Sequence, residues 1–94
     1  MSRINIYAEI DIERNKQDAK WGVQNYFPIE WMTVLTEEVG EAAKEAWEHH
    51  VGHYPQLSIT NYRKELIQIA AVAIAAIEAL DNSNASIAEN AAHV

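Results

Sequence analysis

Three glutamates in the segment TEEVGEAAKE, residues 36–45, have a spacing that favours chemistry. At about 100° per residue, Glu38, Glu41 and Glu45 share one narrow stripe at the edge of a helix's apolar arc. Carboxylates stacked three and four residues apart repel one another. The only nearby lysine, Lys44, falls on another face. The stripe therefore needs either a compensating cation or full solvation.

An acidic residue also stands at the start of the most apolar stretch of the chain, residues 66–80. Glu65 and Gln68 fall on the same helical face as Val72. An unpaired carboxylate buried on that face would be costly. We therefore expect something to compensate Glu65.

The acidic residues of these two helices are expected to lie close together in space. Counted from the linker between the two helices, Glu41 and Glu65 stand at heights of about 14 Å and 9 Å, within one turn of each other. Glu38, Glu41, Glu65 and Gln68 are therefore predicted to converge. Converging oxygens without a basic residue suit a hard divalent cation, with Mg²⁺ preferred and Mn²⁺ as an alternative. The alternative interpretation is an ordinary solvated face of a glutamate-rich helix.

The elements that must position these residues are helices. Apolar residues at helical spacing predict one helix over about 30–50 and another over 66–80, joined by a linker over 51–60 into a hairpin. The isoleucines near the N-terminus alternate as in a strand, but no partner strand is visible, so we expect a helix over 4–19. Residues 20–28 are then a loop. The fold class is all-α, a bundle based on a helical hairpin.

Proline, glycine and candidate N-cap residues mark the expected ends of these helices. Pro28 stands near the start of the first hairpin helix and Gly52 just past its end. Ser58 and Thr60 are candidate N-caps of the second hairpin helix. The tail from about residue 82 is rich in Asn and Ser, and we expect one or two short helical turns there, with fraying.

Length, charge and composition limit the class of protein. Ninety-four residues make one domain, residues 1–94, and the net charge of −7 argues against binding DNA or RNA. The chain has no cysteine and no apolar leader at its N-terminus, so we expect a cytoplasmic protein. Residues 66–80 are shorter than the roughly 20 that span a bilayer, so no membrane partner is expected. A helix apolar on nearly all sides must be covered on nearly all sides, which predicts a homo-oligomer.

The acidic residues also carry a resemblance to a known family. Glu37-Glu38-x-x-Glu41, followed after a linker by Glu65, is similar to the ExxE…ExxD signature of the MazG-like, all-α nucleoside triphosphate pyrophosphohydrolases. The resemblance covers roughly residues 16–80. It implies a helical homodimer or homotetramer that uses Mg²⁺ to split a (deoxy)nucleoside triphosphate into the monophosphate and pyrophosphate.

The resemblance also assigns roles to individual residues. The family's metal ligands fall on Glu38, Glu41 and Glu65, and Glu37 is the neighbouring acid that orients or deprotonates the attacking water. The fourth ligand, an aspartate in the family, is Gln68 here, which lowers the ligand charge by one and should weaken metal binding.

Substrate contacts are expected from three further residues, Trp21, Lys20 and Lys44. Trp21 is either a base-stacking residue beside the acidic residues or a structural plug at the open end of the hairpin. The two lysines either meet the triphosphate or solubilise the surface. The alternative function is a non-catalytic helical oligomer that keeps a weakened metal or nucleotide site and acts by binding a partner. Gln68 and the lack of the family's phosphate-binding residues in the short tail favour that alternative.

Overall fold

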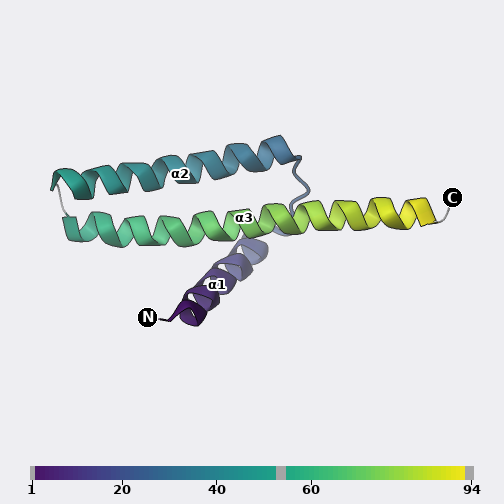
Figure 1. Cartoon of the computed structure of the whole chain (residues 1–94), viewed down its shortest axis with the longest axis horizontal. Helices are drawn as coiled ribbons and strands as arrows, with labels where there is room; N and C mark the ends of the chain where they lie inside the picture. The colour runs from purple at the N-terminus through teal and green to yellow at the C-terminus, as the bar shows by residue number, and fades with distance from the viewer. Residues whose placement is uncertain (1, 53–54, 93–94) are drawn as a thin grey trace.

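The computed structural model describes the backbone of residues 2–52 and 55–92, and the side chains of residues 2–52 and 56–83. Over these residues it contains three helices and no strand (Figure 1). They are α1 (Arg3–Trp21), α2 (Pro28–Val51) and α3 (Pro55–Ala92). The prediction of an all-α chain with three main helices is confirmed.

Each end of α1 has a residue suited to it. The side chain of Ser2 accepts a hydrogen bond from the backbone N–H of Asn5 at 3.3 Å, which caps the helix N-terminus. Gly22 follows the last residue with φ 69°, a backbone conformation that glycine adopts without steric cost. The chain therefore leaves α1 abruptly and enters the short loop to α2.

The ends of α2 explain the hairpin. The side chain of Glu30 accepts a hydrogen bond from the backbone N–H of Phe27 at 2.9 Å, and Pro28 occupies the first helical position. Gly52 ends the helix in the left-handed conformation with φ 84°, and its N–H bonds back to the carbonyls of Glu48 and His49. The chain can then reverse within a few residues, as the positions of Pro28 and Gly52 predicted.

The third helix is longer than the sequence analysis predicted. It begins at Pro55, so Ser58 and Thr60 lie inside it and are not N-caps. It then continues without a break to Ala92, where one or two separate short turns were expected. The physical reason is that no glycine or proline follows residue 55, and the alanine-rich sequence offers no stop signal.

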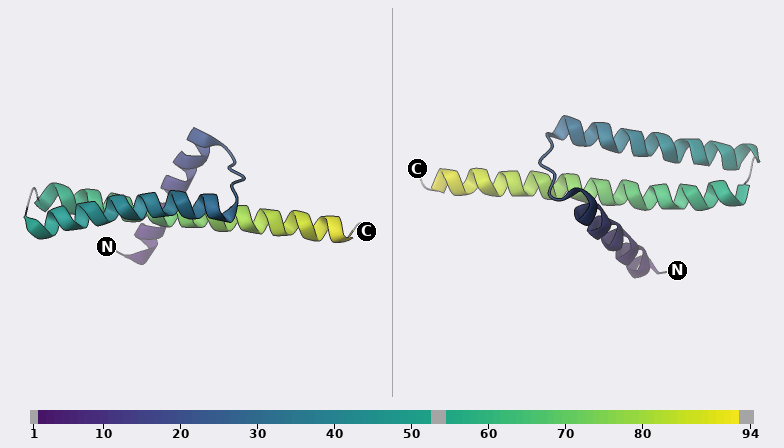
Figure 2. Two further views of the ribbon diagram at one scale, coloured as in Figure 1. Left: turned by 90° about the horizontal axis from the view of Figure 1, so that it is seen from above. Right: turned by 180° about the vertical axis from the view of Figure 1, so that it is seen from behind.

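The helices are arranged as an antiparallel hairpin of α2 and α3, with α1 crossing α3 obliquely (Figures 1 and 2). Over the described residues α1 packs against α3 and not against α2. The C-terminal part of α3 extends past the start of α2, so the molecule is elongated, with extents of 61 × 28 × 22 Å. The hairpin is the element that brings distant acidic residues together.

The apolar core of the hairpin is small. It centres on Trp31 of α2 and on Val72 and Ala75 of α3. The partly buried side chains that pack against it are Val34, Leu35, Ala76 and Ala79. No large side chain among the described residues is fully buried. Much of the apolar surface of this chain therefore faces outward.

Polar contacts hold α1 against α3. The guanidinium of Arg14 donates to Glu78 at 3.0 Å and to Asp18 at 2.8 Å. About one turn earlier along α1, Glu9 accepts a hydrogen bond from Arg63 at 2.8 Å. These two contacts set the crossing of α1 over α3.

The apolar part of α3 is long. By length and composition, residues Gln56–Ser83 could cross a membrane, a weak indication because the core helix of a soluble protein passes the same test. This stretch is longer than residues 66–80, whose short length was the reason for expecting no membrane span. Charged residues interrupt it at Arg63, Lys64 and Glu65 and again at Glu78 and Asp81.

Candidate metal centre

Glu38, Glu41 and Glu65 come together where α2 and α3 face each other. One carboxylate oxygen from each residue lies within 4.8 Å of one from each of the others. We call these three residues the acidic cluster. The convergence predicted from helical spacing is confirmed for these three carboxylates, and for Gln68, the fourth residue of that set, it stays a prediction.

The register of the hairpin explains this convergence. Glu41 lies ten residues before the end of α2 at Val51, and Glu65 lies ten residues after the start of α3 at Pro55. Equal distances from the turn place the two side chains at the same height of an antiparallel pair. Glu38 stands one turn from Glu41 on the same side of α2, so it joins them.

The carboxylates of the acidic cluster are poorly compensated. The Oε2 atoms of Glu38 and Glu65 are both buried and have no hydrogen-bond partner. Among the described side chains, no lysine or arginine forms an ion pair with any of the three glutamates. A buried acceptor without a donor carries a desolvation penalty of about 1–3 kcal/mol. Such oxygens are available to a ligand that supplies positive charge.

The acidic cluster raises the proton affinity of Glu65. Burial of its carboxyl group, its contact with Glu38 and the nearby charge of Glu41 raise the pKa of Glu65 to about 7. These causes all penalise an additional negative charge at one place. A divalent cation would reverse that penalty, because it stabilises the ionised form of each carboxylate.

The other residues assigned to the site are close to the acidic cluster in the sequence. Gln68 is half-buried one turn after Glu65 on α3. Glu37 is exposed on α2, beside Glu38. Glu45, which shares the acidic stripe of α2, is half-buried and is not part of the group of converging oxygens.

Two of the residues expected to contact substrate, Lys20 and Trp21, are not brought to the acidic cluster. Trp21 is the last residue of α1 and is 56% exposed, so it does not plug the hairpin. The ammonium of Lys20 lies 5.0 Å from the centre of the Trp21 ring. α1 reaches Glu78, about 20 Å along α3 from Glu65, and Trp21 lies about two turns beyond Arg14. Lys44 is exposed on α2.

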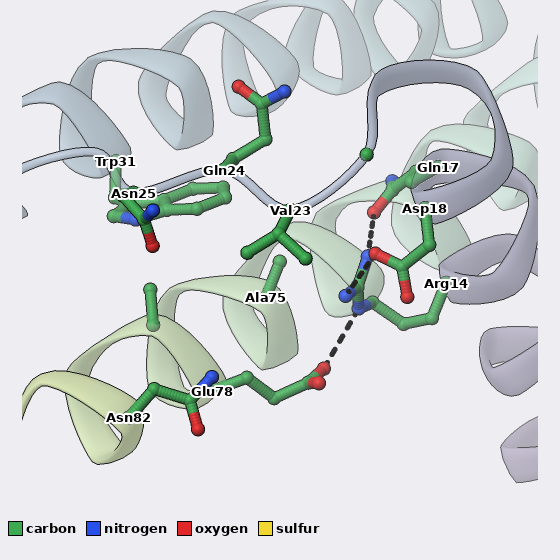
Figure 3. Close-up of a pocket in the computed structure, with 12 residues that line it drawn as sticks. Arg14, Gln17, Asp18, Val23, Gln24, Asn25, Trp31, Ala75, Glu78 and Asn82 are labelled. Atoms are coloured by element: carbon green, nitrogen blue, oxygen red, sulfur yellow. Dashed lines mark hydrogen bonds and ion pairs between the residues drawn. The ribbon is translucent and has the colours of Figure 1, made fainter. Parts of the chain in front are cut away.

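A small pocket, of about 120 Å³, lies at the junction of α1, the loop after it and α3 (Figure 3). Arg14 lies on one side of it and Trp31 on the other. Sequence reasoning missed this pocket. The spacing of Arg14 and Asp18 indicates a local pair, but the ion pair of Arg14 with Glu78, sixty-four residues later, depends on how α1 crosses α3.

The fold and the acidic cluster define an all-α protein built on a helical hairpin, with a carboxylate-rich candidate metal centre between the two helices. No protein-family model, curated protein or solved structure matches this chain. The resemblance to the MazG-like family therefore rests only on the residues of this chain that carry it. Function must be argued from the acidic cluster.

Proposed function

We propose that this chain hydrolyses (deoxy)nucleoside triphosphates to the monophosphate and pyrophosphate in a Mg²⁺-dependent reaction, with Mn²⁺ as a substitute. The observation that carries the proposal is the meeting of Glu38, Glu41 and Glu65, two of which have buried oxygens without partners. The resemblance of these residues to the MazG-like signature supplies the reaction.

The donor set fits a hard divalent cation. All three residues offer carboxylate oxygens, and neither sulfur nor imidazole belongs to the group. Oxygen-only sites of this kind suit Mg²⁺ and Mn²⁺ over Zn²⁺ or copper. When bound, the cation would neutralise phosphate charge and polarise the phosphoryl oxygens.

In this proposal each residue of the chain has one role. Glu38, Glu41 and Glu65 hold the cation, and Gln68 completes the set with a neutral amide oxygen. Glu37 orients the attacking water and accepts its proton. Because Glu37 is exposed on the same helix as Glu38, it can reach a substrate that arrives from solvent.

Substrate binding is the less complete part of the proposal. Lys20 and Trp21 lie together at the end of α1, where the ring can stack on a base and the ammonium can meet a phosphate. Lys44 is the exposed cation that follows the acidic cluster on α2. We propose these three residues as substrate contacts, made when the nucleotide spans from the acidic cluster toward α1.

Release of pyrophosphate from a panel of nucleoside and deoxynucleoside triphosphates, with Mg²⁺ and with chelator, tests this proposal. We expect release only with the metal, and its loss in Glu38→Gln and Glu65→Gln, because each removes a ligand charge at nearly constant volume. Glu45→Gln is the matched control on the same stripe and should keep activity. Glu37→Gln should lose activity while retaining metal binding.

A non-catalytic oligomer is the second candidate, because Gln68 stands where the family has an aspartate and the acidic cluster has no basic neighbour in ion-pair contact among the described side chains. That candidate predicts nucleotide or metal binding without any pyrophosphate. Absence of release from every nucleotide, in a chain that binds Mg²⁺, would favour it over the hydrolase.

A further inference from the structure

A second pocket lies beside the one in Figure 3 and is larger and mainly apolar. Its volume is about 620 Å³, and it is formed where the loop before α2 and the start of α2 face α3. Aromatic and aliphatic side chains make up most of its wall. They are Tyr26, Phe27, Trp31, Met32, Ile77 and Leu80. We call this cavity the apolar pocket.

The size and the uncharged wall of the apolar pocket fit a small uncharged molecule. Pockets that hold small molecules have volumes of about 300–1,000 Å³ and are lined mostly by apolar and aromatic side chains. None of the described residues that line the apolar pocket is charged. A charged ligand would lose hydration there without gaining an opposite charge. The wall therefore selects against the triphosphate of a nucleotide.

Trp31 supplies the polar group that such a ligand would need. Its side chain is 9% exposed, and its indole N–H is buried without a hydrogen-bond partner. Buried tryptophan N–H groups usually have an acceptor. One that lacks an acceptor has lost its hydration without compensation. A ligand that offers an acceptor to this N–H would supply that compensation.

The two neighbouring pockets share the wall to which Trp31 belongs. Four residues line both pockets, and three of them have polar side-chain groups, namely Trp31, Asn25 and Asn82. Figure 3 shows these three on the side of its pocket away from Arg14. Polar groups therefore gather at the shared wall. They give a bound molecule one preferred orientation, with its acceptor toward Trp31.

The aromatic rings in the wall favour an aromatic ligand. The rings of Tyr26 and Trp31 meet edge to face, with their centroids 5.1 Å apart and an interplanar angle of 62°. Phe27 also lines the pocket and is 72% exposed. Aromatic rings prefer offset-stacked and edge-to-face neighbours. A further ring can therefore join this group and cover part of the apolar surface that Phe27 presents to water.

We propose that the apolar pocket binds an uncharged aromatic molecule that carries a hydrogen-bond acceptor, such as a carbonyl oxygen, and that this acceptor bonds to the indole N–H of Trp31. The pocket is distinct from the acidic cluster, because Trp31 precedes Glu38 by seven residues, about 10 Å along α2. The inference does not rest on metal binding or on hydrolysis. Its failure and the failure of the proposed function are therefore distinguishable.

Benzophenone and diphenylmethane provide a matched pair of probes, since one has a carbonyl group where the other has a methylene. Equilibrium dialysis measures the affinity of each probe for the wild type, Trp31→Phe and Trp47→Phe. Loss of the indole N–H in Trp31→Phe should lower the preference for benzophenone over diphenylmethane by about tenfold. Trp47→Phe is the control and should keep the wild-type preference. The same preference in Trp31→Phe and the wild type, or no binding of benzophenone to the wild type, would overturn the proposal.

A second measurement locates the bound molecule. Irradiated benzophenone inserts into nearby C–H bonds, so mass spectrometry should find it on lining residues such as Met32, Ile77 and Leu80. Ala79→Leu fills the pocket from its wall and should weaken benzophenone binding by about tenfold. Ala43→Leu, at an exposed position of α2, should bind like the wild type.

Three results of this measurement would refute the proposal. The first is that the crosslinks form only on residues that do not line the apolar pocket. The second is that a folded Ala79→Leu variant binds benzophenone as tightly as Ala43→Leu does. The third is that deoxynucleosides displace benzophenone, which would assign the pocket to the base of the nucleotide.

Discussion

Two adjacent sections of the hairpin differ in the side chains that lie between α2 and α3. Around Trp31, α2 and α3 close on apolar side chains, with Val72 and Ala75 opposite the indole ring. About two turns further along α2, they close on the acidic cluster, where buried oxygens of Glu38 and Glu65 have no partner. The first section stabilises the hairpin and the second destabilises it.

This difference indicates that the apolar section offsets the free energy that the acidic section costs. A buried carboxylate group without compensation is disfavoured by folding alone, so its presence beside a well-formed apolar section indicates a role other than packing. The apolar section sets the register, and the register brings Glu41 and Glu65 to one height.

Removing the indole ring from the apolar section should have the largest effect. Trp31→Ala leaves a cavity against Val72 and should lower the free energy of unfolding by about 3–5 kcal/mol. Thermal unfolding followed by circular dichroism measures this loss. Trp21→Ala is the control, since that ring is 56% exposed and its removal should change the melting temperature little. Equal losses in the two variants would contradict the assignment of the core.

Neutralising the acidic section should stabilise the metal-free protein. The pKa of Glu65 is raised to about 7 from an ordinary value of 4.5, so the folded chain binds the proton more tightly than the unfolded chain. The free energy of unfolding should therefore fall as pH rises through this interval. In chelator at pH 8, Glu65→Gln should be more stable than the wild type by about 1–3 kcal/mol.

Denaturant titrations of both proteins at pH 5 and pH 8 measure that effect. The advantage of Glu65→Gln should shrink at pH 5, where the wild-type carboxyl is protonated, and Glu45→Gln should not show this pattern. A wild type that is more stable than Glu65→Gln at both pH values would mean that the carboxylate is a structural group.

The fourth ligand position is tested by adding charge to it. Gln68→Asp places a fourth carboxylate near the acidic cluster, so the variant should be less stable than the wild type in chelator. The same charge should tighten Mg²⁺ binding by about tenfold in calorimetric titrations. Gln68→Glu keeps the side-chain length and separates charge from reach. Unchanged Mg²⁺ affinity in both variants would remove Gln68 from the ligand set.

The smallest effect is expected at Gly40, in the middle of α2. A Cβ atom built there meets nothing within 4 Å, so alanine fits without a clash. Gly40→Ala should raise the free energy of unfolding by about 0.5–1 kcal/mol, because glycine is a poor residue for a helix interior. A loss of stability in thermal melts would indicate that another surface approaches this point closely.

Much of the fold was predictable because its signals are local. Helical periodicity identified α2 and α3, the lack of a visible partner strand favoured a helix for α1, and Gly52 placed the turn of the hairpin. The convergence of Glu38, Glu41 and Glu65 followed from counting residues on either side of that turn. The start of α3 was placed too late because Ser58 and Thr60 look like caps, whereas Pro55 already begins the helix.

The position of α1 was not predictable, because it depends on contacts between residues far apart in the chain. Arg14 meets Glu78, and Arg63 meets Glu9, without any local pattern that pairs them. The same contacts place Trp21, at the end of α1, far from the acidic cluster. Whether a nucleotide bridges the two places stays a prediction, and so does the oligomer.

The claim that Glu38, Glu41 and Glu65 form a divalent metal centre is tested by the binding of Mn²⁺, followed by the loss of the free ion's electron paramagnetic resonance signal. The wild type should bind one Mn²⁺ per chain, and Mg²⁺ should displace it. Glu45→Gln should behave like the wild type, whereas Glu65→Gln should leave the free signal undiminished. An undiminished signal with the wild type, or equal binding by wild type and Glu65→Gln, would contradict the claim.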